Sequence, residues 1–130
     1  MEIKELIEHA IKEQWEIVEK EIPKVASDYR YLDWAKKLGI QDEDYRVRDL
    51  AASIFEHAQL REEDLNEVEI QLFARLQAET SPAVRCRAAF ALASQNFQKN
   101  QTEIKEVLNE ATKEPHFKDR AEGYLETFNE

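Results

Sequence analysis

Three short cationic motifs are the residues of this chain with the clearest capacity for chemistry. Each has the form cation-x-cation, and they are Arg46 with Arg48, Arg85 with Arg87, and Lys118 with Arg120. Guanidinium and ammonium groups bind carboxylates and phosphates through charge-assisted hydrogen bonds. If the three segments stack side by side, their cations form a stripe suited to an acidic peptide, a phosphate or a short nucleic-acid backbone. The alternative interpretation is that Arg48, Arg85 and Lys118 bridge to acids of adjacent turns and hold the fold together.

The other titratable side chains do not form a recognisable catalytic or metal-binding pattern. His9, His57 and His116 are isolated, and no two of them share the spacing of a metal pair on one helical turn. The sequence has no Gly-rich phosphate loop and no nucleophile elbow. Cys86 is the single cysteine, so an intramolecular disulfide is excluded and a buried thiol in a reducing cytoplasm is the simplest expectation. We therefore predict no catalytic residue, metal or cofactor, which favours a binding protein over an enzyme.

Composition limits the class of protein and of partner. The 130 residues are 42% hydrophobic and 35% charged, with only two glycines and three prolines, which is typical of one soluble, helical domain. The formal net charge of −10 disfavours a nonspecific nucleic-acid or anionic-membrane binder, because such proteins need a basic surface. No signal peptide or membrane-spanning stretch is expected.

A small-sided apolar stretch at residues 81–97 is predicted to be the central helix of the fold. Ser81 is suited to cap its first turn and Pro82 to occupy the first helical position. Its many alanines would let neighbouring helices approach on more than one side. Apolar residues at three- and four-residue steps predict about seven helices in all. The other six are expected at residues 2–21, 25–38, 44–59, 62–76, 100–111 and 115–128, with Pro23 ending the first and a left-handed Gly39 closing the second.

A weak internal repeat connects three of these helices. Each copy has a turn residue, an apolar residue followed at once by a cation, an alanine four positions after the apolar residue and a large apolar residue eight positions after it. The apolar-cation pairs are Val47-Arg48, Val84-Arg85 and Phe117-Lys118, which lie 37 and 33 residues apart. This pattern resembles the second helix of the HEAT-repeat family, and the resemblance covers residues 28–130.

The resemblance implies an all-α fold, a short right-handed α-solenoid of HEAT-like helix pairs. The chain would then be one domain, residues 1–130, with a capping helix at 1–22 and helix pairs at 25–59, 64–98 and 101–129. The family's turn aspartate, which pairs with the arginine of a neighbouring repeat, corresponds to Asp42 and is replaced by Glu79 and Thr112 in the later copies.

The resulting functional hypothesis is a scaffold or protein-protein interaction module that binds through its concave helix face. Its partner would be a protein or peptide, with an acidic segment if the cationic stripe is the binding element, and the chain itself would be a monomer or a homodimer. One alternative is a nucleic-acid or phosphate-binding module that uses the stripe. Another is an enzyme similar to HEAT-like DNA glycosylases or pigment-attachment lyases. Phe90 and Arg87 are expected to share a partly exposed patch. The predicted binding residues are Arg46, Arg48, Arg85, Arg87, Phe90, Lys118 and Arg120.

Overall fold

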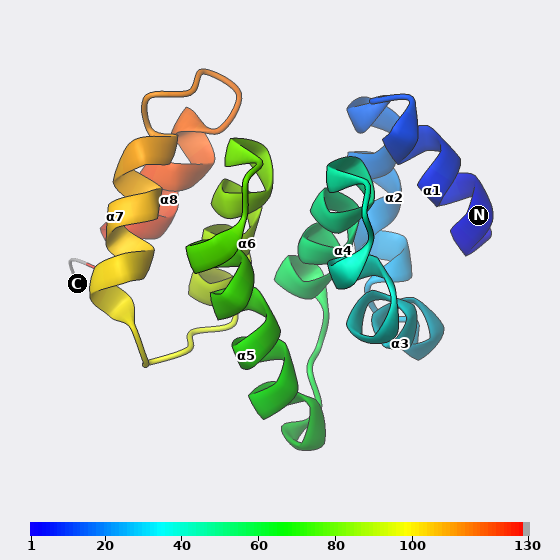
Figure 1. Cartoon of the computed structure of the whole chain (residues 1–130), viewed down its shortest axis with the longest axis horizontal. Helices are drawn as coiled ribbons and strands as arrows, with labels where there is room; N and C mark the ends of the chain where they lie inside the picture. Colours follow the sequence, from blue (N-terminus) through cyan, green and yellow to red (C-terminus); the bar gives the residue numbers. More distant parts are fainter. Residues whose placement is uncertain (129–130) are drawn as a thin grey trace.

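The chain folds into helices joined by short turns (Figure 1). The structure is a computed structural model that describes residues 1–128, and within them it contains eight α-helices, one short 3-10 helix and no strand. The all-α prediction is therefore confirmed, with one α-helix more than expected. The elements are α1 Ile3–Ile11, α2 Trp15–Val25, α3 Tyr29–Lys37, η1 Gly39–Gln41, α4 Tyr45–His57, α5 Glu62–Ala78, α6 Pro82–Ser94, α7 Gln101–Ala111 and α8 Lys118–Phe128.

The N-terminal segment forms two helices, so the prediction of one long capping helix is wrong. The chain turns at residues 12–14, where Glu13 takes a left-handed conformation with φ 57°. No glycine, asparagine or proline marks this turn in the sequence. Pro23, expected to end a helix, lies inside α2, which continues to Val25. The apolar face of α2 is buried on both sides of the proline, at Val18 and Val25, and this packing outweighs the lost backbone hydrogen bond.

Gly39 has a different role from the one expected. It does not have a positive φ and begins η1 instead of closing α3 in a left-handed conformation. A Cβ atom at this position would lie 2.7 Å from Cη2 of Trp34 and 3.0 Å from Cβ of Ala51. Contacts this short are not sterically accessible, so the glycine is needed because the indole ring packs directly against its backbone.

The eight helices contact one another as four successive pairs, α1 with α2, α3 with α4, α5 with α6, and α7 with α8. The second helix of each pair also contacts the second helix of the next pair, so that α2, α4, α6 and α8 follow one another across the molecule. We call these four helices the second-helix row. Figure 1 shows the order of the pairs, with α1 and α2 at one end of the molecule and α7 and α8 at the other.

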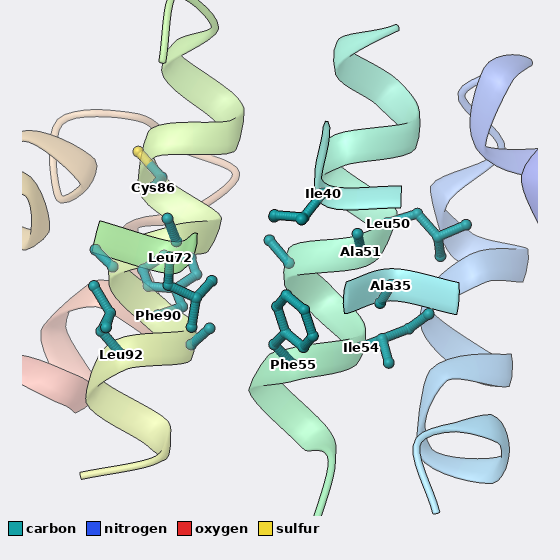
Figure 2. Packing of buried hydrophobic residues seen from close by; sticks show 14 of the residues in the cluster. Ala35, Ile40, Leu50, Ala51, Ile54, Phe55, Leu72, Cys86, Phe90 and Leu92 are labelled. Atoms are coloured by element: carbon teal, nitrogen blue, oxygen red, sulfur yellow. The ribbon is translucent and has the colours of Figure 1, made fainter. Parts of the chain in front are cut away.

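Helix α6 is the centre of this arrangement, as the sequence predicted. It contacts α4, α5, α7 and α8, and every residue from 84 to 92 except Arg85 is buried. Its alanines allow the close approach of α4 on one side and of α5, α7 and α8 elsewhere. Figure 2 shows the packing between α4 and α6, including Phe55 and Phe90. Cys86 lies in this core as a free thiol, and burial raises its pKa to about 11.

Candidate binding surface

Two of the predicted binding residues, Arg48 and Arg85, link one helix pair to the next. Arg48 donates from Nε and Nη2 to the carboxylate of Glu79, at 2.9 and 2.7 Å. Arg85 donates from Nη1 to Glu110 at 3.0 Å and from Nε to the carbonyl oxygen of Leu76 at 3.1 Å. Both arginines therefore bridge to acids of the following pair, as the alternative interpretation of the cationic stripe expected.

The turns that precede α4 and α6 repeat the same hydrogen bonds. Asp42 accepts from the backbone N–H of Asp44 at 2.8 Å, and Glu79 accepts from the backbone N–H of Ser81 at 3.1 Å. Asp44 and Ser81 then cap the helices that follow them, as predicted. Burial raises the pKa of Glu79, but hydrogen bonds from Arg48 and from the Ser81 backbone bring it below its usual value. Glu79 therefore accepts the same backbone hydrogen bond before α6 that Asp42 accepts before α4.

Arg87 and Phe90 do not form the partly exposed patch that the sequence suggested. Their exposed fractions are 3% and 0%, because α4 and α8 pack against this side of α6. Arg87 donates from Nε to Asp49 at 3.0 Å and from Nη2 to Glu19 at 3.3 Å. Phe90 packs against the ring of Phe117, with the two centroids 5.6 Å apart. Both residues belong to the interior and are excluded from any docking surface.

Arg46 is also committed to internal contacts. Its Nε and Nη2 atoms bind the carboxylate of Asp44 at 3.0 and 2.8 Å, and its Nη1 donates to the carbonyl oxygen of Ile11 at 2.6 Å. A cation at this position satisfies a carbonyl at the C-terminal end of α1. Arg46 therefore fixes α4 to the end of α1.

The remaining two cations, Lys118 and Arg120, lie at the start of α8 and are exposed. The side chain of Lys118 makes no hydrogen bond or ion pair with any other residue in 1–128. The side chain of Arg120 is 38% exposed and has one ionic contact, from Nη1 to Glu56 at 3.4 Å. Glu56 is itself buried and accepts a hydrogen bond from the hydroxyl of Tyr124. Burial and the Glu56 charge raise the pKa of Tyr124, so the phenol remains a donor and holds the carboxylate in place.

Arg87 and Arg120 meet at a small hollow where the four helices of the second-helix row converge. The cavity has a volume of about 40 Å³, room for about one water molecule. The structure thus brings together two of the six predicted cations, while Arg46, Arg48, Arg85 and Lys118 do not line this hollow. The residues that line the hollow are Trp15, Val18, Glu19, Ile22, Ser53, His57, Arg87 and Arg120.

Sequence reasoning missed the acids that hold these two arginines. Asp49 and Glu56 are both buried, on a helix whose other buried positions are mostly apolar. Ser53 lies four residues after Asp49 and three before Glu56, so the three side chains share one face of α4. That spacing of polar residues within an apolar helix was the available signal for a buried polar cluster.

The Asp49 carboxyl makes the stability of the protein depend on pH. Burial raises its pKa to about 6, although Arg87 acts in the opposite direction. The folded protein therefore binds the proton more tightly than the unfolded chain, whose aspartates titrate near pH 4. We expect the wild type to lose about 3 kcal/mol of stability relative to Asp49→Asn as the pH rises from below 4 to above 6. Urea unfolding of both proteins across this range measures the difference. A wild type that gains stability over the variant with rising pH would contradict the prediction.

The described part of the chain has no metal-binding cluster and no helix that could span a membrane. Among residues 1–128, no three or more His, Cys, Asp or Glu side chains are grouped so that they could hold a metal ion. None of the helices described above is both long enough and apolar enough to cross a membrane. Comparison of the chain with protein-family models, with curated proteins and with solved structures found no match.

Proposed function

We propose that the chain is a small HEAT-like α-solenoid that acts as a protein-binding module in the cytoplasm. Three observations support the architecture: the four successive helix pairs, the mutual contacts of the second-helix row, and the repeated turn in which an acid binds the backbone before α4 and before α6. Helix pairs of this kind stack into an elongated body that offers one continuous face to a partner. A cytoplasmic setting agrees with a single cysteine that is buried as a free thiol.

The observation that carries the functional proposal is how fully each of the six cations is used by acids within the fold. Arg46, Arg48, Arg85 and Arg87 each bind an acid within the fold. The side chain of Lys118, by contrast, has no such partner among residues 1–128, and Arg120 is held only through Nη1, by Glu56 at 3.4 Å. We propose that Arg120 binds a carboxylate of the partner beside the hollow of the second-helix row, and that Lys118, two positions earlier on α8, adds positive charge at the same end of this helix.

Arg120 is suited to this role because its position is fixed before a partner arrives. Nη1 of the guanidinium donates to Glu56 at 3.4 Å, and the hydroxyl of Tyr124 donates to the same carboxylate. A guanidinium that is already oriented loses less conformational entropy when it binds a carboxylate. A stripe of six free cations for phosphate is not supported, because five of the six form an ion pair with an acid within the fold. The proposal therefore favours an acidic protein segment over a nucleic-acid backbone.

A charge-reversal comparison tests the proposal. The wild type, a Lys118→Glu/Arg120→Glu double variant and a Lys37→Glu control serve as baits, and quantitative mass spectrometry compares the proteins retained by each. Lys37 lies on α3 with 69% of its side chain exposed, and it loses only a local ion pair. We expect at least one protein to be retained by the wild type and the control but lost with the double variant. Equal retention by all three baits, or no retention by any, would overturn the proposal.

A further inference from the structure

A second cavity, which shares no lining residue with the hollow of the second-helix row, lies at the C-terminal end of α6. It has a volume of about 230 Å³, opens to solvent, and is lined by the end of α6, the loop that follows it, the start of α7 and the last turns of α8. Although 35% of the residues in the chain are charged, none of the lining side chains in the described part of the chain carries a charge. The lining residues are Ala93, Asn96, Phe97, Gln98, Gln101, Tyr124, Thr127 and Phe128.

The polar side of this cavity is a chain of three carboxamides. Gln98 donates from Nε2 to Oδ1 of Asn96 at 3.0 Å, and Gln101 donates from Nε2 to Oε1 of Gln98 at 3.1 Å. Asn96 has a left-handed backbone with φ 57°, a conformation that asparagine tolerates better than most residues. Among residues 1–128, Nδ2 of Asn96 and Oε1 of Gln101 have no hydrogen-bond partner. The chain of amides therefore ends in one free donor and one free acceptor.

The apolar side of the cavity consists of the rings of Phe97, Tyr124 and Phe128. The hydroxyl of Tyr124 is held by Glu56, and the ammonium of Lys105 lies 5.5 Å from the centroid of the Phe128 ring. These contacts fix the two α8 rings in position. Aromatic side chains fixed in this way favour stacking with the π-face of a planar aromatic ligand.

We propose that this pocket binds a small, uncharged aromatic amide of about the size of a nucleobase. The ring of the ligand stacks on the aromatic side, and its amide accepts from Asn96 and donates to Gln101, which completes the chain of carboxamides. Carboxamide side chains pair in the same way with the donor and acceptor edge of a base. A charged ligand is disfavoured because none of the described side chains that line the pocket carries a counter-charge and an ion would lose part of its hydration there. This inference does not depend on the proposed protein-binding function.

Titration of the full-length 15N-labelled chain with nicotinamide and with nicotinate tests the proposal. The two probes have nearly the same shape, but nicotinamide is neutral and nicotinate carries a negative charge at pH 7. We expect nicotinamide to shift the backbone signals of residues 96–101 and 124–128 saturably, with a millimolar dissociation constant. Nicotinate should shift them at least tenfold more weakly. No saturable shift with nicotinamide, or equal binding of the two probes, would overturn the proposal.

Two variants test the assigned hydrogen bonds. Asn96→Gly removes the carboxamide but suits the left-handed backbone, and Gln101→Leu removes the acceptor at the edge of the pocket. Each should weaken nicotinamide binding about three- to tenfold, the effect of one lost hydrogen bond. Gln77→Leu is the matched control, because Gln77 is exposed on α5 and does not line the cavity. If the control weakens binding as much as Gln101→Leu does, the assignment of the pocket is wrong.

Discussion

Replacing Arg87 with leucine should lower the free energy of unfolding by about 3–5 kcal/mol at neutral pH. The guanidinium is the ionic partner of Asp49, which is 3% exposed. Without Arg87, the carboxylate must remain buried without a counter-charge or bind a proton. Urea unfolding followed by circular dichroism measures the loss.

A control variant and a rescue variant distinguish the loss of the buried ion pair from the effect of removing any arginine of α6. Arg85→Leu removes a cation two residues away whose partner, Glu110, has 57% of its side chain exposed, so the cost should be about 1 kcal/mol or less. The double variant Asp49→Leu/Arg87→Leu should recover most of the stability, because no unpaired charge is then buried. If Arg87→Leu is no more destabilising than Arg85→Leu, the buried ion pair does not hold α6 to α4 as described.

Replacing Phe90 with alanine should also lower the free energy of unfolding by about 3–5 kcal/mol. The ring is fully buried and packs against Phe117 and Tyr124, with both centroid distances 5.6 Å. These contacts join α6 to the last helix, so amide hydrogens of α8 should exchange with solvent much faster in the variant. Thermal or urea unfolding gives the loss of stability, and hydrogen exchange gives its location.

The conservative variant Phe90→Leu provides the comparison. It keeps most of the apolar volume and should cost less than about 1.5 kcal/mol. If Phe90→Ala costs as little as Phe90→Leu, the ring is not part of the core. That result would restore the partly exposed patch that the sequence suggested.

The sequence predicted those features that depend on neighbouring residues along the chain. Ser81 followed by Pro82 determines the start of α6, and Asp44 determines the start of α4, because a cap needs only a side chain and the N–H groups just beyond it. The central place of α6 also followed from its own composition. Its alanines and its lack of a polar face indicate contact with several neighbours.

Features that depend on distant residues could not be predicted in the same way. The turn at Glu13 has no local signal, because lysine, glutamate and glutamine are common within helices. The exposure of Arg87 and Phe90 depends on where α4 and α8 pack, which the periodicity of α6 does not reveal. In a helix that is buried on all sides, an arginine is more readily explained as the partner of a buried acid than as an exposed binding residue. For Arg87 this acid is Asp49.

The links made by Arg48, Arg85 and Arg87 all join different helix pairs. Arg48 and Arg85 reach forward to the next pair, whereas Arg87 reaches back to Asp49 in one pair and Glu19 in another. A pair excised from the middle of the chain would lose ionic partners on both sides. The molecule is therefore expected to melt as one cooperative body, and shortening it by a single pair would weaken the pairs that remain.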